Sequence, residues 1–394
     1  MARIEKAFSL IRNGANIKQG LDDSGYPITR IETISNRIVD RSKMGYAGIT
    51  DIAKYSDYIL QDGDILMSHI NSETHLGKVA LYKKEGEETI IHGMNLLCLR
   101  PKQDLIDSRY AFYYLSSDAF LRQIPRITKK SVNQASFNVA ALKGLSIAIP
   151  DIEQQRRMIH SLEKIDGLIT LRKEQLAKLD ELVKARFVEM FGDPASNPMH
   201  WDTKTFRQAS VRLSDGPFGS NLKSEHYVQS GIRVIRLGNI GVGRFINNDQ
   251  SYISEEHYEK LKKYTCKAGD IVIGTLGEPN LRACLVPETI EFAINKADCV
   301  HYVPRPEILN KYFVCQYINC PETLSLASGM VHGQTRSRIS SGQLAEMPIF
   351  IPPMNLQQQF ATFVEQTNKT KLTIQASLDK LEVMKKALMQ EYFG

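Results

Sequence analysis

Apolar residues recur in alternating steps of four and three along two long stretches of the chain. In the first, ten positions between 158 and 190 follow this spacing and eight are apolar, with only Arg172 and Arg186 interrupting the stripe. In the second, seven of ten positions between 360 and 392 are apolar or aromatic. Spacing of this kind over more than four heptads predicts the seam of a coiled coil.

Each helix requires a packing partner, because neither is expected to be stable alone in water, and the other helix is the nearest candidate. We therefore predict that they pair antiparallel. The alternative is that each is an ordinary amphipathic helix packed on its own domain, but 37 residues extend roughly 55 Å, which exceeds the width of a 150-residue domain. The predicted seam residues are Leu162, Ile165, Ile169, Leu176, Leu179, Val183, Val364, Ile374, Leu378, Leu381 and Leu388.

The segment that precedes each long helix alternates short β-type runs with loops and also contains a short helical stretch. The β-type runs are 77–82, 96–99, 232–237 and 270–273, and the helical stretches lie near 108–116 and 309–318. This pattern predicts small α+β domains with curved or barrel-like sheets.

The chain is an internal duplication. Residues 149–192 align without a gap to 351–394 at an offset of 202, and both segments end in Phe-Gly. Gly63-Asp64-Ile65 aligns to Gly269-Asp270-Ile271 at an offset of 206, so the second copy is four residues shorter between these anchors. A period near 200 indicates a duplicated domain with pseudo-twofold symmetry.

The predicted organisation is a first domain at 1–148, a central helix at 149–192, a second domain at 193–350 and a C-terminal helix at 351–394. The fold class is α+β: two pseudo-symmetric α/β domains with small curved sheets, joined by two long antiparallel helices. The first domain has no match to His200-Trp201-Asp202. We therefore expect the C-terminal end of the chain to complete its opening strand.

Composition places the chain among ordinary globular proteins. It has 394 residues, 24% of them charged, and a mean hydropathy of −0.27. No apolar run approaches the roughly 20 residues that cross a bilayer, and the N-terminus lacks a signal-peptide pattern, so a cytoplasmic location without membrane contact is expected. The helices carry +2 of the formal charge of +6, which leaves +4 for the rest of the chain, chiefly the two domains. This charge favours an anionic partner.

Motifs of catalysis are missing. The sequence contains no phosphate-binding loop, no dinucleotide fingerprint, no H-E-x-x-H and no G-x-S-x-G. Its six cysteines form no C-x-x-C pair and are expected to be reduced, structural thiols. His69 and His75 near Glu73 are expected to be structural or surface residues, not ligands. We predict no catalytic residue, no metal site and no cofactor in this chain.

Two loops at matched positions, 126–136 and 330–338, mix basic and amide side chains but differ in sequence. In the major groove, Arg forms hydrogen bonds with guanine, and Asn or Gln with adenine. The two loops are therefore predicted to be equivalent sites that read different bases. A third cluster at 218–224 offers phosphate contacts. Solvated loops without a ligand are the alternative. The predicted DNA-binding residues are Lys129, Lys130, Ser131, Asn133, Gln134, Ser220, Asn221, Lys223, His332, Gln334, Thr335, Arg336 and Ser337.

The whole chain resembles the specificity subunits of type I restriction-modification systems. The resemblance rests on the segments 149–155 and 351–357, which each open a long helix that closes in Phe-Gly, and on 216–223, 234–240 and the paired Gly-Asp-Ile elements. It implies two target recognition domains, each of which reads one half of a split double-stranded DNA sequence. The coiled coil would fix the spacer between the halves.

The resemblance also implies partners. Two methyltransferase subunits would dock on the helices, and two restriction subunits with translocase activity would join them. S-adenosylmethionine, ATP and Mg would belong to those subunits and not to this chain. One alternative is a coiled-coil adaptor outside restriction, with β-rich domains that bind protein or RNA. Another is an enzyme with an unfamiliar site, which would require activity from the purified chain alone.

Overall fold

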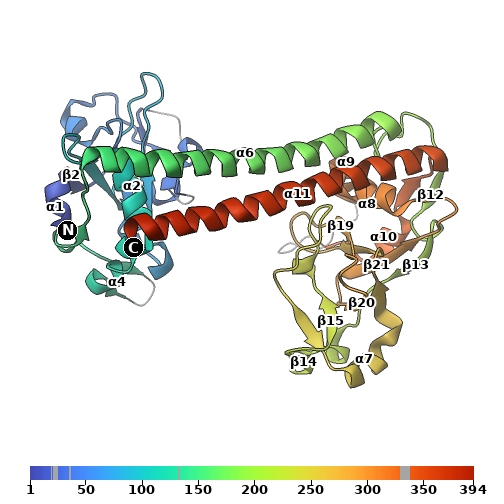
Figure 1. Cartoon of the computed structure of the whole chain (residues 1–394). Helices are drawn as coiled ribbons and strands as arrows, with labels where there is room; N and C mark the ends of the chain where they lie inside the picture. The colour runs from blue at the N-terminus through green and yellow to red at the C-terminus, as the bar shows by residue number, and fades with distance from the viewer. Residues whose placement is uncertain (19, 21–24, 35–36, 132–133, 329–337) are drawn as a thin grey trace. The chain divides into compact units, whose positions relative to one another are not determined.

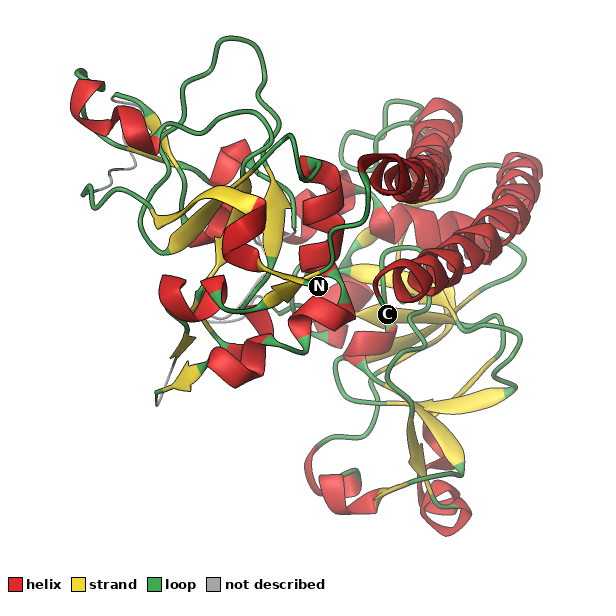
Figure 2. Cartoon of the chain, turned by 60° about the vertical axis from the view of Figure 1, so that its left-hand side comes forward, coloured by secondary structure: helices red, strands yellow, loops and turns green. Residues whose placement is uncertain are grey.

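The computed structural model describes residues 1–18, 20, 25–34, 37–131, 134–328 and 338–394. The chain divides into two compact units: unit 1 comprises Met1–Lys173 with Ala376–Gly394, and unit 2 comprises Glu174–Gln375. Each unit holds one globular domain and parts of two 40-residue helices, α6 (Ile152–Phe191) and α11 (Met354–Phe393). Both helices are uninterrupted, whereas short strands and loops make up most of each domain (Figures 1 and 2).

The two domains share one sheet order. In the first, antiparallel pairing gives the order β2-β8-β5-β7, formed by β2 (Phe8–Asn13), β8 (Leu96–Pro101), β5 (Ile65–Ser68) and β7 (Val79–Leu81). In the second, the order β13-β21-β18-β19 is formed by β13 (Ser210–Ser214), β21 (Cys299–Pro304), β18 (Ile271–Gly274) and β19 (Arg282–Leu285). The duplication predicted from sequence is therefore a duplication of topology.

Strand register shows where the second copy is shorter. Ile65 pairs with Leu81 and Leu99, and its equivalent Ile271 pairs with Leu285 and Tyr302. The offset therefore falls from 206 at the first of these strands to 204 and then 203, and it reaches 202 at the long helices. The four-residue difference is spread over several loops and not concentrated in one deletion.

Central strands are buried on both faces because their alternate side chains point into two cores. Ile65 and Met67 of β5 join the core that contacts the long helices, while Leu66 joins a smaller cluster on the opposite face. In β18, Ile273 likewise joins the core that contacts the long helices, and Val272 joins a smaller cluster on the opposite face. This accounts for strands that read as continuous apolar runs.

Further elements complete each domain. The first also contains β1 (Ala2–Arg3), α1 (Ile4–Ala7), β3 (Pro27–Ile28), β4 (Gly45–Tyr46), β6 (Ile70–Asn71), α2 (Ser108–Ser116), α3 (Asp118–Leu121), α4 (Ile124–Ile127), β9 (Lys129–Lys130), β10 (Ala135–Ser136), α5 (Val139–Lys143) and β11 (Ser146–Ile147). The second also contains β12 (Thr203–Thr205), β14 (Tyr227–Val228), β15 (Ile232–Ile235), β16 (Ser251–Ile253), α7 (Glu255–Leu261), β17 (Thr265–Lys267), β20 (Phe292–Asn295), α8 (Lys311–Asn319), α9 (Pro321–Ser328), α10 (Ser341–Glu346) and β22 (Pro348–Phe350).

The expectation that the C-terminal end completes the opening strand of the first domain is wrong. β1 pairs with β11, just as β12 pairs with β22 in the second domain. Two residues before α1 suffice for this short pairing. The chain's C-terminus remains helical to Phe393 and contributes a side chain to the core of unit 1 instead of a strand.

A buried glutamine attaches the start of each long helix to its own domain. Gln155 accepts a hydrogen bond from Asp107 N (2.9 Å) and donates to the carbonyls of Leu105 (3.1 Å) and Pro150 (2.9 Å). Gln357 accepts from Asn310 N (2.8 Å) and donates to the carbonyls of Ile308 (2.9 Å) and Pro352 (2.8 Å). Because both amides are fully buried, these bonds fix where each helix leaves its domain.

The Phe-Gly ends attach each helix to the other domain. In unit 2, the Phe191 ring lies edge-on to Phe313 with centroids 4.9 Å apart. In unit 1, Phe393 lies edge-on to Tyr110 at 5.6 Å. The following glycines have φ of +82° and +73°, as a left-handed helix cap requires. Each domain is thus held by the start of one long helix and the end of the other.

Within each unit, α6 and α11 run antiparallel. In unit 1, Lys385 pairs with Asp166 (2.5 Å) and Lys173 with Glu382 (3.3 Å). In unit 2, Lys371 pairs with Asp180 (2.6 Å). The lysines that interrupt the apolar stripe of α11 are therefore matched by carboxylates of α6.

Among the described residues, no helix combines the length and apolar character needed to span a membrane.

Candidate nucleic-acid interface

The predicted seam residues all face inward. The buried members are Leu162, Ile165, Ile169, Val183, Val364 and Leu378, and the half-buried members are Leu176, Leu179, Ile374, Leu381 and Leu388. Leu162 and Val183 also belong to the cores of the first and second domains. The seam therefore joins helix to helix and helix to domain, so packing limits the freedom of each domain to rotate on its support.

In the first domain, the predicted basic loop is a hairpin added to the edge of a small sheet. β9 and β10 pair with each other and β10 pairs with β6. Ser131 donates from both N and Oγ to the Gln134 carbonyl at 2.8 Å, which closes the turn. Lys129, Lys130, Ser131 and Gln134 are exposed, and Lys130 pairs with Glu73 at 2.8 Å. Asn133 lies outside the described residues.

In the second domain, the matching loop is described only at its end. His332, Gln334, Thr335, Arg336 and Ser337 lie outside the described residues. The returning chain is nevertheless attached as in the first domain: Ile339 N donates to Thr275 O (3.0 Å) where Phe137 N donates to His69 O (3.1 Å). Arg338 forms a bridge with Leu276, equivalent to the pairing of Ser136 with Ile70. The returning ends of the two loops therefore occupy equivalent places in their domains.

The predicted phosphate loop lies beside this returning chain. Ser220, Asn221 and Lys223 are exposed, and the Asn221 carbonyl lies 2.9 Å from His257 Nε2. Next to them, the Arg338 guanidinium carbon lies 6.0 Å from the Phe218 ring centroid. The structure thus brings Phe218 together with Arg338, which are 120 residues apart in sequence.

Two carboxylates, Asp298 and Asp215, lie close to the returning chain of the second domain. Arg338 pairs with Asp298 at 2.8 Å, which holds the guanidinium at the base of the loop. The Asp215 carboxylate accepts a hydrogen bond from Ser341 Oγ. Burial raises the pKa of Asp215 above its usual value, so this carboxyl group is neutralised more easily than an exposed one.

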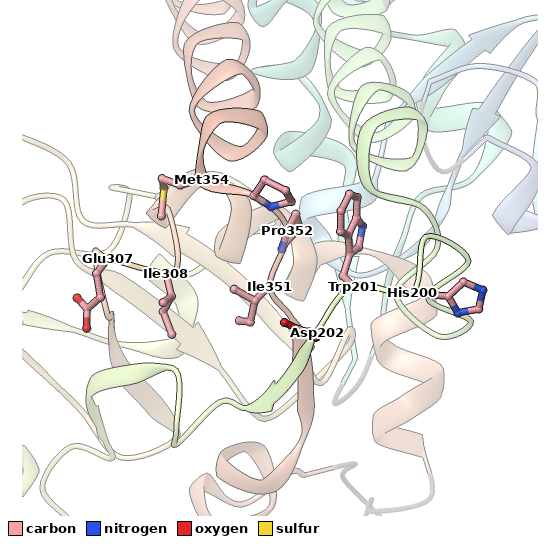
Figure 3. Close-up of a pocket in the computed structure, with 9 residues that line it drawn as sticks. His200, Trp201, Asp202, Glu307, Ile308, Ile351, Pro352 and Met354 are labelled. Atoms are coloured by element: carbon pink, nitrogen blue, oxygen red, sulfur yellow. The ribbon is translucent and has the colours of Figure 1, made fainter.

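The cavity in Figure 3 has a different character. It encloses about 430 Å³ in unit 2 and is lined by His200, Trp201, Asp202, Glu307, Ile308, Ile351, Pro352, Pro353 and Met354. Trp201 donates its indole N–H to the Phe191 carbonyl at 3.0 Å, so the ring is part of the helix attachment. Two carboxylates and no lysine or arginine line the cavity, which disfavours a phosphate ligand.

The six cysteines are free and buried. The two histidines near Glu73 differ in burial, since His69 is buried whereas His75 is exposed. Among the described residues, no cluster of three or more His, Cys, Asp or Glu side chains is arranged to hold a metal ion.

Sequence reasoning missed three residues of the second domain, Tyr227, Arg236 and Lys296, which the structure gathers into one cluster. Arg236 lies within the predicted β-type run 232–237 and was not singled out there. Lys296 has no local signal, because it reaches Arg236 through the parallel pairing of two strands that are about 60 residues apart.

These features define a two-domain scaffold with exposed polar loops on each domain. The chain belongs to the family described as type I restriction modification DNA specificity domain, whose model matches residues 6–181 and 223–383.

Two relatives come from Methanocaldococcus jannaschii. One, provisionally named as the type I restriction enzyme MjaX specificity subunit, is 43% identical over 192 residues, which cover 48% of this chain and 44% of that protein. The chain thus spans less than half the length of this relative. The type I restriction enzyme MjaVIII specificity subunit is 20% identical over 356 residues, which cover 84% of this chain and 79% of the relative.

Solved structures show the same fold. The type I restriction-modification S subunit from M. genitalium superposes with a TM-score of 0.56 at 14% identity, covering all of this chain and 95% of that one. A chain from a study of complex assembly and conformational transition of the type I restriction-modification system gives 0.55 at 14% identity, covering all of this chain and 96% of that one.

Proposed function

We propose that this chain is the DNA sequence-recognition subunit of a type I restriction-modification complex and has no active site of its own. Each domain binds one half of a bipartite double-stranded target, and the coiled coil sets the spacer. The observation that carries this proposal is the mirrored attachment by Gln155 and Gln357 and by Phe191 and Phe393. Two similar reading domains on one packed helix pair suit a split target with a fixed spacer.

The proposed partners are two methyltransferase subunits and two restriction subunits, which supply S-adenosylmethionine, ATP and Mg chemistry in the cytoplasm. Family membership supports this assignment. Exposed apolar side chains on the helices, including Leu171 at 54% and Val383 at 71%, offer surface for such subunits.

The proposed base readers are the loops at 129–136 and 332–337. Their attachment to equivalent places, together with their unrelated sequences, suits two half-sites with different bases. Replacement of Gln334 or Arg336 should therefore weaken methylation at one half-site sequence only. Equal loss on all sequences would contradict a base-reading role for these residues.

A gel shift with the full chain and its methyltransferase subunits tests the function. Retarded duplex DNA containing the host methylation motif, and weaker retardation of duplex in which either half-site is scrambled, is the expected result. Binding to RNA or to a protein with no retention of duplex DNA would instead favour a coiled-coil adaptor outside restriction.

A further inference from the structure

Two parallel strands of the second domain bring two cations side by side. β15 and β20 are parallel neighbours in the sheet β14-β16-β15-β20-β17, with Ile235 in register with Asn295. Arg236 and Lys296 are the residues that follow, and Lys296 N donates to the Ile235 carbonyl at 2.9 Å. Because the strands are parallel, both side chains emerge at the same carboxyl edge. Figure 1 shows β14, β15 and β20 in one region of unit 2.

One aromatic ring holds both cations. The Arg236 guanidinium carbon lies 5.9 Å from the centroid of the Tyr227 ring, and the Lys296 ammonium lies 5.5 Å from it. Each cation is attracted by the face of the ring. The attraction offsets part of the repulsion between two like charges held close together.

Acidic groups do not balance this cluster. The Arg236 guanidinium donates only from Nη1, to Asp249 Oδ2 (3.0 Å) and Ser251 Oγ (3.2 Å), so its other two nitrogens have no acceptor among the described residues. In the same part of the chain, no carboxylate lies within 4.0 Å of Lys296 or of Arg233, which is only 7% exposed. Lys296 therefore has no acidic partner in this part of the chain, and the single carboxylate of Asp249 leaves Arg236 and Lys296 with a net positive charge, which attracts an anion.

The phosphate loop predicted from sequence is packed against this cluster. A Cβ atom on Gly216 would lie 2.2 Å from the Asn295 carbonyl oxygen, so only glycine lets the loop approach β20 this closely. Leu222 then packs in the same apolar cluster as Tyr227. Lys223, next in the chain, is exposed, and its ammonium lies 3.6 Å from the Glu225 carboxylate.

We propose that Arg236, Lys296 and Tyr227 form a binding site for a phosphate of the DNA backbone. This inference rests on the proposed function, because it describes how the second domain would bind the phosphate backbone of DNA independently of base sequence. Phosphate contacts position a protein on the duplex, whereas base contacts select the sequence.

The first domain lacks the equivalent site. Ile28 pairs in parallel with Ile91 just as Val234 pairs with Ile294. Two residues further along each strand, the first domain has Arg30 and Gly93 where the second has Arg236 and Lys296. The ammonium is therefore missing, and the second domain should supply the larger share of salt-dependent affinity.

The test is Lys296→Gln in the full chain, with binding to fluorescent duplex DNA measured between about 50 and 200 mM salt. The expected result is a decrease of about 0.9 in the slope of log affinity against log salt, equal for cognate and scrambled duplexes. Lys204→Gln is the matched control, because it removes an exposed positive charge from β12, away from the cluster. Arg236→Lys, which keeps the charge, tests whether the fork geometry matters.

The outcomes separate the two ideas. If the unmodified chain, measured together with its methyltransferase subunits, binds no duplex at any salt concentration, the proposed function fails. If it binds and Lys296→Gln gives the slope of Lys204→Gln, the function stands and the phosphate site is wrong. A loss confined to cognate duplex would also overturn the phosphate site, because that result belongs to base reading.

Discussion

Buried amides attach the helices at the scale of single residues. Gln155 and Gln357 each satisfy one backbone donor and two backbone acceptors inside an otherwise apolar region. A side chain that both donates and accepts is needed there, and glutamine supplies both functions from one planar group. Its length lets the helix bond to the turn before it and to the domain below it.

Replacement of Gln155 by Leu should destabilise the first domain by about 3 kcal/mol, because it leaves one buried N–H and two carbonyls without partners. Gln357→Leu should have a similar effect on the second domain. Urea unfolding measures both. The control is Gln154→Leu at the neighbouring exposed position, and the same midpoint for Gln154→Leu and Gln155→Leu would contradict the role of the buried amide.

Two buried histidines should make the first domain sensitive to acid. Burial lowers the pKa of His69 and of His92 from 6.5 to about 4. Between these values the unfolded chain binds more protons than the folded one, so stability falls as the pH falls from 6.5 to about 4. Between pH 7 and pH 5 the loss should be about 2 kcal/mol for each histidine.

Unfolding of the unmodified chain and of two variants at both pH values checks this. His69→Leu should reduce the pH dependence, and His75→Asn, at an exposed position, should leave it unchanged. The same pH dependence in the unmodified chain and both variants would show that burial of His69 does not govern it.

At the scale of elements, the hydrophobic pattern predicted the helices and strands but not which strands are neighbours in a sheet. The four-three spacing placed the seam of both long helices, and α2 occupies the predicted range 108–116. The strands were also found, because their apolar runs are short and bounded by turns. The neighbours of β15 were not, since parallel partners such as β20 are joined by long connections that leave no local signal. The Tyr227, Arg236 and Lys296 cluster was missed for the same reason.

Each Phe-Gly end should stabilise the domain that does not hold the start of its own helix. Phe393→Ala should loosen the first domain by about 3 to 5 kcal/mol, because it empties a space between Tyr110 and Tyr114. Phe191→Ala should do the same to the second domain. Hydrogen exchange, resolved along the chain, measures both.

Val383→Ala is the control, because Val383 is exposed on α11. It should leave the exchange of the first domain unchanged. Faster exchange confined to α11 in Phe393→Ala would contradict attachment of the helix end to the domain core.

At the scale of the whole molecule, duplication supplies two similar domains, each attached to parts of both long helices. The repeat was readable from sequence because the glutamines and the Phe-Gly ends make equivalent contacts in the two copies. The loops proposed to read bases have unrelated sequences, so comparison of the two copies indicates only where they lie. In the proposed account, the coiled coil fixes the spacer and each domain reads one half-site.

The most direct test of this account is sequencing of methylated DNA from a host that carries a shortened coiled coil. One heptad between Leu168 and Gln175 is deleted together with the facing heptad of α11 around Glu382, the partner of Lys173. A heptad spans about 10.5 Å, so both half-sites should be retained while their spacer shortens by about three base pairs. Methylation at an unchanged spacer would contradict the account.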